Sequence, residues 1–363
     1  MTSSVAAHPT AISLFSGMGG DTLGMEQAGI HVIAYNEKVA VFRQTHEANF
    51  PNSVSLGDDI LKVPDETFAA YRGKVNFLFA GFPCQSFSTG GKRLPDDPRN
   101  TMFREFVRVS RIVEPDVVIG ENVKGLLTKK TQDGDLYIRV IEEEFRKLGY
   151  TVESRVLRCH EHGVPQRRER VIIIGIKTHL LESGKYQLKF PEPFTTKAPF
   201  PDLRHIVTDT TEGALLISPE FDASTIPADC ALETATPITE DQSPHPYLLL
   251  KRDTAERSYN GNDYTNLFSF GKRDSPIHCE LLDVRAPCKT LICTYGHQPR
   301  LLIPFRSQGR LFARALTPDE MKQIQGFPAD YVVTGNRKDQ ITQIGNAVPP
   351  PLIRRVVETV MCV

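Results

Sequence analysis

The chain has 363 residues, of which 40% are hydrophobic and 24% are charged, and its formal net charge is −1. These values are typical of a globular protein and exclude a polycation, so any nucleic-acid surface must be a local gathering of Arg and Lys. No apolar run approaches the roughly 18 residues of a transmembrane span, and residues 1–9 lack the pattern of a secretory signal. The length predicts two domains.

Cysteine usage indicates a reducing compartment. The seven cysteines are odd in number and contain no C-x-x-C pair, which favours neither a disulfide framework nor a zinc site. We therefore expect no metal and a cytoplasmic location, associated with the nucleoid in a bacterium or inside the nucleus in a eukaryote.

The first predicted strand, residues 11–15, runs into the glycine turn 16–20 and then a helical pattern. A second strand, 31–35, ends at Asn36 and Glu37. Glu37 lies 20 residues after Gly17, where nucleotide-binding α/β units place the acid that accepts ribose hydroxyls. Thr22 stands where a dinucleotide fingerprint needs its third glycine, so the turn favours a nucleoside such as S-adenosylmethionine over NAD. An ordinary glycine turn is the alternative.

A third strand is expected before residues 57–60, and a fourth, buried strand at 75–79. Gly81 and Pro83 break the fourth strand and place Cys84 in the loop at its carboxyl end, where open α/β sheets bind ligands. A cysteine in that position is placed to act as a nucleophile. The alternative is an inert, buried thiol.

An amphipathic helix is predicted over residues 102–113 and a buried strand over 116–120, which places Glu121 at another strand end. The alternative for Glu121 is a solvated or helix-capping acid. A helix over 136–149 and strands over 151–157 and 171–176 follow. Between those strands lie Arg167, Arg168 and Arg170, which are either surface charge or a clamp for phosphate and a base edge.

The composition changes after about residue 182, and the sequence predicts three parts. Residues 1–10 form a disordered lead, and residues 11–182 form a catalytic α/β domain that residues 341–363 complete. Residues 183–340 form a smaller, loop-rich domain with short strands. In it, basic residues gather between 285 and 314, as either a solvated face or a surface that follows phosphates. Thr317, Pro318 and Glu320 have the pattern of a capped helix start.

Nine short motifs occur along the chain in the order in which one enzyme family carries them, and their combination is highly specific. They are Phe15 to Gly20, Asn36-Glu37, Asp59-Ile60, Gly81 to Gln85, Glu121 to Val123, Gln166 to Arg170, Leu316 to Pro318, Gln325 to Pro328, and Gly345 to Pro349. On these motifs the chain resembles the DNA (cytosine-5-)methyltransferases. The resemblance covers residues 11–182 and about 285–363, and the unmatched middle is where that family carries its variable target-recognition region.

The resemblance implies a Rossmann-like sheet with helices on both faces and a smaller target-recognition domain. It also implies three groups of site residues. The S-adenosylmethionine site would consist of Phe15, Gly17, Gly19, Gly20, Glu37, Asp59, Ile60, Pro83, Asn346 and Val348. The catalytic residues would be Cys84, Glu121, Arg168 and Arg170. Contacts to DNA would come from Ser88, Arg168, Thr290 and Arg300.

In the implied chemistry, Cys84 adds to carbon 6 of a cytosine that has left the duplex, Glu121 faces ring nitrogen 3, and Arg170 faces the carbonyl oxygen. Arg168 would support the neighbouring phosphate. One position departs from the family pattern: Asn100 follows Arg99 where the family usually has glycine. This difference changes a local turn, and we expect activity to survive it.

Three other functions are open to the sequence. An RNA cytosine-5 methyltransferase of the same fold would carry a Cys-Phe-Thr signature, from which Cys293-Thr294-Tyr295 departs. A catalytically dead DNA-binding relative would lack the cysteine or the glutamate, and both are present. A nicotinamide oxidoreductase would leave Cys84 and Glu121 unexplained. The expected partner is double-stranded DNA and no membrane, and the protein is expected to be a monomer. Whether a cognate restriction endonuclease acts separately beside it is left open by the sequence.

Overall fold

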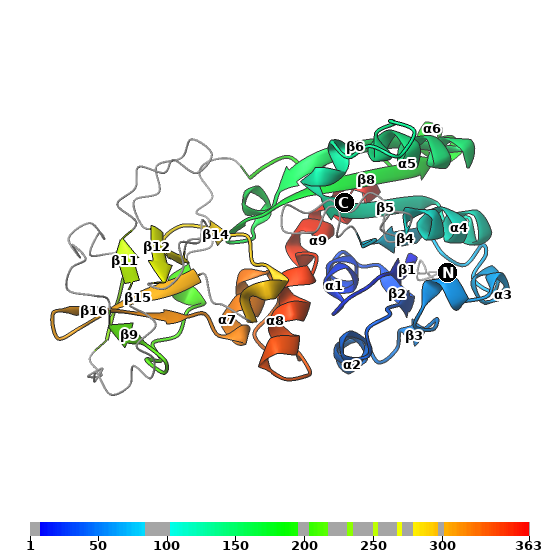
Figure 1. Ribbon diagram of the computed structural model, residues 1–363. Helices are drawn as coiled ribbons and strands as arrows, with labels where there is room; N and C mark the ends of the chain where they lie inside the picture. Colours follow the sequence, from blue (N-terminus) through cyan, green and yellow to red (C-terminus); the bar gives the residue numbers. More distant parts are fainter. Residues whose placement is uncertain are drawn as a thin grey trace, which may run out of the picture.

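The computed structural model describes residues 8–83, 102–194, 203–216, 231–234, 250–252, 267–270, 279–296 and 301–362. Two sheets dominate these residues, with the helices α7 and α8 between them (Figure 1). Within the described residues, no helix is both long and apolar enough to cross a membrane.

The first sheet has seven strands in the order β3-β2-β1-β4-β5-β8-β6. Their bounds are β1 Thr10–Leu14, β2 His31–Asn36, β3 Val54–Ser55, β4 Phe77–Ala80, β5 Val117–Val123, β6 Tyr150–Arg158 and β8 Glu169–Lys177. The strands from β3 to β5 are parallel, and β8 runs antiparallel to both β5 and β6. This sheet confirms the predicted Rossmann-like class.

Helices cover both faces of the first sheet, so its central strands are buried on both sides. The helices are α1 Gly20–Gln27, α2 Ala40–Asn49, α3 Asp65–Ala69, α4 Phe103–Val113, α5 Tyr137–Lys147 and α6 Thr178–Glu182. In β4, Leu78 and Ala80 pack into a core with α3, α4 and α5, whereas Phe77 and Phe79 pack into a second core with α1 and α9. This alternation lets four successive apolar residues all be buried.

The chain order of the sheet creates a topological switch point between β1 and β4. From β1 the chain goes outward to β2 and β3, and it then returns to the other side of β1 as β4. Loops that follow β1 and β4 therefore diverge at the carboxyl edge, which is where open α/β sheets bind ligands. The loop after β1 begins at Phe15 and the loop after β4 begins at Gly81.

The second sheet joins segments that are distant in the sequence. Its order is β11-β12-β13-β15-β16-β9, and β10 pairs with β15. The bounds are β9 Leu215–Leu216, β10 Leu232–Glu233, β11 Leu250–Arg252, β12 Leu267–Phe270, β13 Cys279–Leu281, β15 Leu301–Ser307 and β16 Arg310–Ala315. A two-stranded sheet pairs β7 Gln166–Arg167 with β14 Cys288–Lys289, so the loop before β8 is joined to the second half of the chain.

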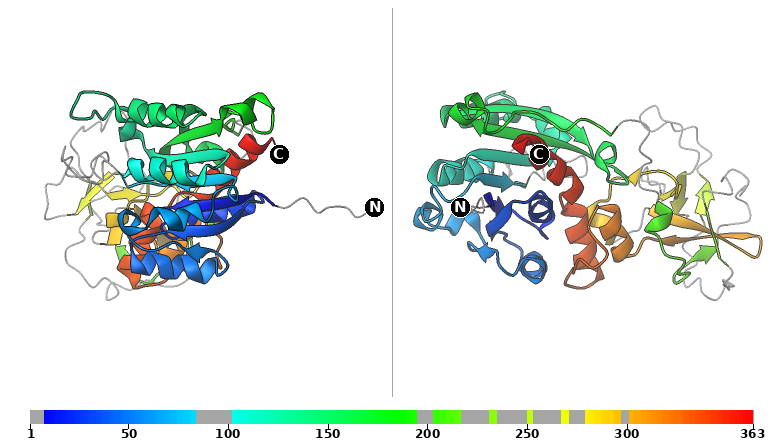
Figure 2. Two further views of the ribbon diagram at one scale, coloured as in Figure 1. Left: turned by 90° about the vertical axis from the view of Figure 1, so that its right-hand side faces the viewer. Right: turned by 180° about the vertical axis from the view of Figure 1, so that it is seen from behind.

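The C-terminal part returns to the first sheet through α7 Pro318–Ile324, α8 Arg337–Asn346 and α9 Pro350–Met361. Figure 2 shows the red α9 beside the blue α1 from behind. A Cβ on Gly20 would lie 2.1 Å from the carbonyl oxygen of Val348, and one on Gly24 would lie 2.6 Å from that of Pro350. Glycine at both positions therefore lets the C-terminal segment lie directly on α1.

Two element boundaries differ from the sequence prediction. Strand β5 continues through Glu121 to Val123, because the antiparallel β8 supplies a partner as far as Arg170. Tyr186 and Phe190 pack into the core shared with α9, so the first packing unit extends beyond residue 182. The predicted division into domains otherwise stays a prediction.

Candidate active site and nucleic-acid interface

The turn after β1 contains residues in the left-handed backbone conformation, which amino acids with a side chain rarely adopt. Phe15, Gly17 and Gly19 have φ of 55°, 57° and 89°, all in the left-handed region. A Cβ on Gly19 would lie 2.6 Å from the Phe50 ring and 2.9 Å from the Tyr331 hydroxyl, whereas one on Gly17 would meet none of the described atoms within 4 Å. Gly19 is thus required by packing, and Gly17 leaves open space beside the turn.

Glu37 is fixed at this turn by two backbone donors. Its Oε2 accepts from the Gly17 N–H and its Oε1 from the Val39 N–H, each at 2.8 Å. Burial raises the pKa of Glu37, while these backbone hydrogen bonds act to lower it. Each oxygen keeps a second lone pair, so the carboxylate can still accept ribose hydroxyls.

The loop after β3 is tied to the end of β2. The Asn36 side-chain amide donates to the carbonyl oxygens of Gly57 and Asp58 at 2.7 and 3.1 Å. Asp59 pairs with Lys38 at 2.9 Å, and the hydrogen bond from Lys38 lowers the pKa of Asp59. Asp59 and the buried Ile60 are thereby placed one strand away from Glu37.

Three segments of the predicted cofactor site meet at Gly81. A Cβ on Gly81 would lie 3.7 Å from Val348 Cγ2 and 3.9 Å from the Phe15 carbonyl oxygen. The structure therefore brings the turn after β1, the loop after β4 and the C-terminal segment together at the switch point. Because the carboxylate of Glu37 keeps acceptor capacity and open space lies beside Gly17, these residues fit a nucleoside cofactor.

Some predicted residues lie outside the described part of the chain: Cys84, Ser88 and Arg300. The loop that leads to Cys84 is described up to the half-buried Pro83. It is held by Asn122, whose amide donates to the Phe82 carbonyl oxygen at 3.1 Å. Asn122 therefore links this loop to β5, which also carries Glu121.

Glu121 and Arg170 form an ion pair in which Arg170 Nε lies 2.6 Å from Glu121 Oε1. The two residues come from the neighbouring antiparallel strands β5 and β8, and each is 9% exposed. The Arg170 Nη1 donates to the Glu169 carbonyl oxygen at 2.7 Å. A carboxyl and a guanidinium are thus held together beside the loop of Pro83, and their predicted contacts with a cytosine stay predictions.

Arg168 does not have the surroundings that its predicted phosphate contact requires. Its side chain is 2% exposed, and its guanidinium donates to the carbonyl oxygens of Leu291, Gly345 and Ala347 at 3.0 to 3.2 Å. Burial lowers the pKa of Arg168 to about 9, which leaves it charged at neutral pH. The prediction of a DNA contact by this side chain is therefore corrected: in this structure Arg168 binds backbone in the interior.

Two glutamines that were quoted in motifs but given no role extend the contacts of Arg168. Gln166 bonds to Gln325 through their side-chain amides, and its Oε1 accepts from the Leu291 N–H at 2.8 Å. The Gln325 amide donates to the Ala347 carbonyl oxygen at 2.6 Å. In the sequence, Gln166 stands two positions before Arg168 and Gln325 two positions before Phe327. This place within the quoted motifs was the only signal that could have revealed the two glutamines.

Thr290, predicted to contact the DNA backbone, lies at this junction and is half-buried. Its hydroxyl donates to the Arg167 carbonyl oxygen at 3.1 Å. The threonine is therefore fixed to the loop that precedes β8, and its contact with DNA stays a prediction.

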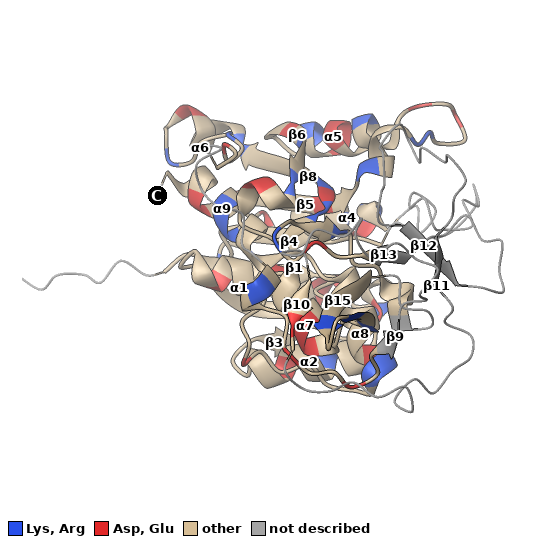
Figure 3. Ribbon diagram, turned by 90° about the vertical axis from the view of Figure 1, so that its left-hand side faces the viewer, with Lys and Arg blue, Asp and Glu red and all other residues tan. Residues whose placement is uncertain are grey.

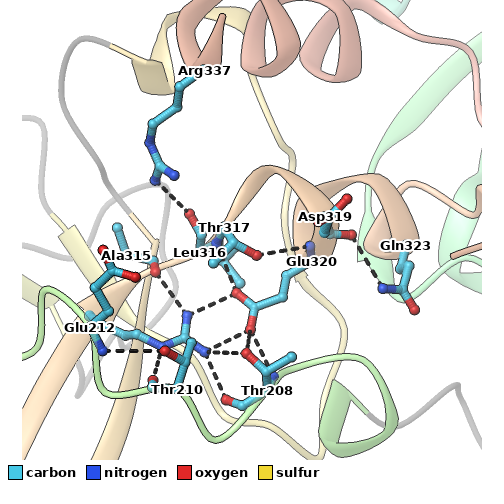
Figure 4. Close-up of polar contacts among 11 residues, drawn as sticks. Thr208, Thr210, Glu212, Ala315, Leu316, Thr317, Asp319, Glu320, Gln323 and Arg337 are labelled. Atoms are coloured by element: carbon cyan, nitrogen blue, oxygen red, sulfur yellow. Dashed lines mark hydrogen bonds and ion pairs between the residues drawn. The ribbon is translucent and has the colours of Figure 1, made fainter. Parts of the chain in front are cut away.

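The interpretation of residues 285–314 as one phosphate-tracking surface is wrong for Arg314. Arg314 is 2% exposed and pairs with Glu320 of α7, with nitrogen–oxygen distances of 2.7 and 2.9 Å. Figure 4 shows Glu320 at the centre of this network, with Thr208, Thr210 and Thr317 around it. Arg285 pairs with Asp283 at 2.9 Å. The network joins β16 to α7 and to the segment around Thr208.

The surface of the first domain carries charges of both signs. Figure 3 shows both basic and acidic positions along α5. On this helix Arg139, Arg146 and Lys147 pair with Glu142 and Glu144 at 2.9 to 3.3 Å. The three basic side chains are exposed, whereas Glu142 is buried, and pairs that are open to water on one side add little stability. This helix therefore offers no stripe of unpaired basic charge for a phosphate backbone.

Asp21 is a buried acid that sequence reasoning passed over, although it directly follows the glycine turn. It is 2% exposed and accepts a hydrogen bond from the Ser13 hydroxyl. Burial, with a smaller contribution from the charge of Glu121, raises the pKa of Asp21 to about 7 against the hydrogen bond from Ser13. Asp21 is thus an ionisable group beneath the predicted cofactor turn.

Comparisons with known proteins identify the family and the fold. Residues 10–362 match the family of C-5 cytosine-specific DNA methylases. The Type II methyltransferase M1.HphI of Haemophilus parahaemolyticus is 31% identical over 361 residues, which span 97% of this chain and 86% of that protein. The Type II methyltransferase M.PspPI of a Psychrobacter species is 32% identical over 345 residues, spanning 93% and 75%.

Among solved structures, DNMT2 of Spodoptera frugiperda has a similar fold, with a TM-score of 0.62, 16% identity, and coverage of 97% of this chain and 99% of that one. The family match covers nearly the whole chain, and it includes the switch-point turn and the Glu121–Arg170 pair. The chain therefore belongs to the C-5 cytosine-specific DNA methylase family and is a DNA (cytosine-5-)methyltransferase.

Proposed function

We propose that this enzyme transfers a methyl group from S-adenosyl-L-methionine to carbon 5 of a flipped-out cytosine in a specific double-stranded DNA sequence, through a covalent adduct with Cys84. The observation that supports the proposal most is the Glu121–Arg170 pair, held at 2.6 Å beside the loop that leads to Cys84. A paired carboxyl and guanidinium can serve two neighbouring edges of one pyrimidine ring.

The cofactor would be held by the turn from Phe15 to Gly20 and by Glu37, whose remaining lone pairs would accept hydrogen bonds from the ribose hydroxyls. Asp59 and Ile60 would contact the adenine, and Pro83, Asn346 and Val348 would close the site. When bound, S-adenosylmethionine supplies an electrophilic methyl group, and S-adenosylhomocysteine is left as product. That S-adenosylmethionine is the methyl donor follows from the family.

Cys84 would begin the reaction by adding its thiolate to carbon 6 of the cytosine. The electron pair of the ring double bond moves toward carbon 5, which makes that carbon nucleophilic. Glu121 would donate a proton to ring nitrogen 3, and Arg170 would bond to the carbonyl oxygen at carbon 2. Both groups stabilise charge that develops on the ring, and one such group contributes about 3 kcal/mol in other enzymes.

Release would require the reverse movement of electrons. After carbon 5 has gained the methyl group from S-adenosylmethionine, a base removes its proton, the double bond between carbons 5 and 6 forms again, and the thiolate of Cys84 leaves carbon 6. The proton on ring nitrogen 3 would return to Glu121, which restores the enzyme. We propose a water molecule as that base. The cytosine must be outside the duplex for both ring faces to be reached, which costs a few kcal/mol that protein–DNA contacts offset.

The decisive experiment incubates the full chain with tritiated S-adenosylmethionine and unmethylated duplex DNA, followed by bisulfite sequencing to find the methylated word. We expect transfer to cytosine carbon 5, its loss in Cys84→Ala, and its retention in Cys362→Ala, which removes an exposed cysteine in the C-terminal segment. Transfer by Cys84→Ala at the normal rate would contradict the covalent mechanism. A parallel reaction with transfer RNA tests the alternative substrate.

The oligomeric state, the restriction partner and the cellular compartment of the enzyme stay predictions. We expect a monomer, a separately acting cognate restriction endonuclease, and residence in the compartment that contains the DNA, which is the cytoplasm of a bacterial cell. M1.HphI and M.PspPI are Type II methyltransferases of bacteria, which supports the last two expectations.

A further inference from the structure

Three buried side chains meet where β7, the end of α7 and the end of α8 come together. We call Gln166, Arg168 and Gln325 the polar hub; these residues are 0%, 2% and 0% exposed. Their hydrogen bonds reach residues that lie between 22 and 179 positions away in the sequence. The hub therefore fixes distant segments to one another and not merely its own loop.

One side of the hub holds the segment that carries Thr290. The Leu291 N–H donates to Gln166 and the Leu291 carbonyl accepts from Arg168, so both polar backbone groups of this residue are used. Thr290 itself bonds to the Arg167 carbonyl, and β14 pairs with β7 immediately before it. A displacement of Thr290 would strain these bonds.

The other side of the hub holds the segment that closes the predicted cofactor site. Arg168 donates to the carbonyl oxygens of Gly345 and Ala347, and Gln325 donates to that of Ala347. Ala347 lies between Asn346 and Val348, both of which are predicted to contact the cofactor. The guanidinium of Arg168 thus bridges the Leu291 carbonyl on one side and the Ala347 carbonyl on the other.

Close backbone packing makes the two sides respond together. A Cβ on Gly345 would lie 2.3 Å from the backbone nitrogen of Cys293 and 2.5 Å from the carbonyl carbon of Ile292. No gap therefore separates the segment 290–293 from the end of α8. A shift on one side must either move the other side or break bonds to Arg168.

We propose that Arg168 is a positioning residue that couples DNA binding at the Thr290 segment to cofactor binding at the Asn346–Val348 segment. The inference deepens the proposed function and rests on it. If each ligand favours the same arrangement of the hub, each must increase the affinity of the other by the same factor.

The test measures the affinity of the full chain for S-adenosylhomocysteine by calorimetry, alone and with a saturating amount of a long unmethylated PCR duplex of mixed sequence. The ratio of the two dissociation constants is the coupling factor. We expect about fivefold or more for the wild type, the lower end of typical coupling. In Arg168→Lys, one ammonium replaces a guanidinium that bridges three carbonyls, and we expect the factor to fall below about twofold.

Arg314→Lys is the matched control. Arg314 is as buried as Arg168 but lies at the other end of α7, where it bonds to Glu320. A general loss of stability would affect both variants, whereas the coupling factor should fall only in Arg168→Lys. If Arg168→Lys does not fold, Gln325→Met replaces it, because this variant removes the bonds to Gln166 and Ala347 and keeps the arginine.

The outcomes separate the inference from the proposed function. An unchanged coupling factor in a folded Arg168 or Gln325 variant would overturn the inference, and so would an equal fall in Arg314→Lys or a wild-type factor of one. If the wild type shows coupling but transfers no methyl group to any DNA, the proposed function fails and the role of Arg168 stands.

Discussion

Each end of α7 lies beside a buried arginine, but the two arginines bind different kinds of partner. At its start, Arg314 and Glu320 form a buried ion pair that three threonines surround (Figure 4). At its end, Gln325 joins Gln166 and Arg168, whose positive charge is bound by backbone carbonyl oxygens. Both arginines are 2% exposed. The contacts at the start of α7 connect it to the second sheet. The contacts at its end connect the Thr290 segment to the Asn346–Val348 segment of the candidate site.

This difference has an electrostatic consequence. Glu320 cancels the charge of Arg314, whereas carbonyl dipoles solvate the charge of Arg168 without cancelling it. The positive potential therefore persists near the Glu121–Arg170 pair and acts on nearby thiols. For Cys159, which the charges of Arg170 and Arg168 favour as thiolate, burial still raises the pKa to about 11. A reactive thiol in this region must therefore combine positive charge with access to water.

The largest effect should come from breaking the ion pair. Arg314→Met leaves Glu320 buried without its partner, and we expect a loss of about 3–5 kcal/mol in the free energy of unfolding. Urea denaturation measures it. Replacing both residues together, by Arg314→Met with Glu320→Leu, should restore part of the loss. A double variant no more stable than the single one would show that the pair is not the source of the effect.

A smaller effect is expected at the other end of α7. Gln325→Leu removes the bond to Ala347 and leaves Gln166 without its amide partner, at a cost of about 1–3 kcal/mol. We also expect weaker binding of S-adenosylhomocysteine, because Ala347 belongs to the closing segment. A loss of stability with unchanged affinity would separate the hub from the cofactor site.

A still smaller loss should follow from Thr317→Ala. The Thr317 hydroxyl accepts from the Glu320 N–H at 3.2 Å, and the Glu320 carboxylate accepts from the Thr317 N–H at 2.8 Å. Removing the hydroxyl from this capping box should cost about 1 kcal/mol. Thr317→Ser keeps the hydroxyl and should cost less; equal losses in the two variants would exclude the cap as the cause.

The smallest expected effect is the dependence of the free energy of unfolding on pH, which reports on the same ion pair. Burial alone would raise the pKa of Glu320, but the hydrogen bonds from Arg314 and its neighbours hold it below its usual value of 4.5. The resulting stability is complete above the unfolded pKa and is lost as pH falls through the lower folded value. Glu320→Gln should lack this acid-side slope, and a slope identical to that of the wild type would assign it to other carboxylates.

The strands of the first sheet and the helix start at Thr317 could be predicted from the sequence, because their signals are local. Apolar runs such as 75–79 need only burial on both faces, and the capping box is complete within four residues. The approach of Glu37 to Gly17 also follows from strand order. In each case the partners lie in one structural unit.

The roles of Arg168 and Arg314 could not be predicted, because their partners are distant or unremarkable in the sequence. Arg168 binds carbonyl oxygens of residues 123 to 179 positions away, which any amino acid supplies. Arg314 follows other basic residues in the sequence, and a run of this kind suggests an exposed surface. Only the packing of β16 against α7 reveals that Arg314 is buried. A basic motif alone therefore does not distinguish a DNA contact from an interior clamp.

The most direct test of the central claim uses duplex DNA that contains 5-fluorocytosine within the methylated word, because fluorine at carbon 5 cannot leave as a proton does. With S-adenosylmethionine present, we predict a stable protein–DNA adduct that mass spectrometry maps to Cys84 and that Cys84→Ala does not form. Methyl transfer to normal DNA by an enzyme that yields no adduct on the fluorinated duplex, or an adduct at another residue, would contradict the account.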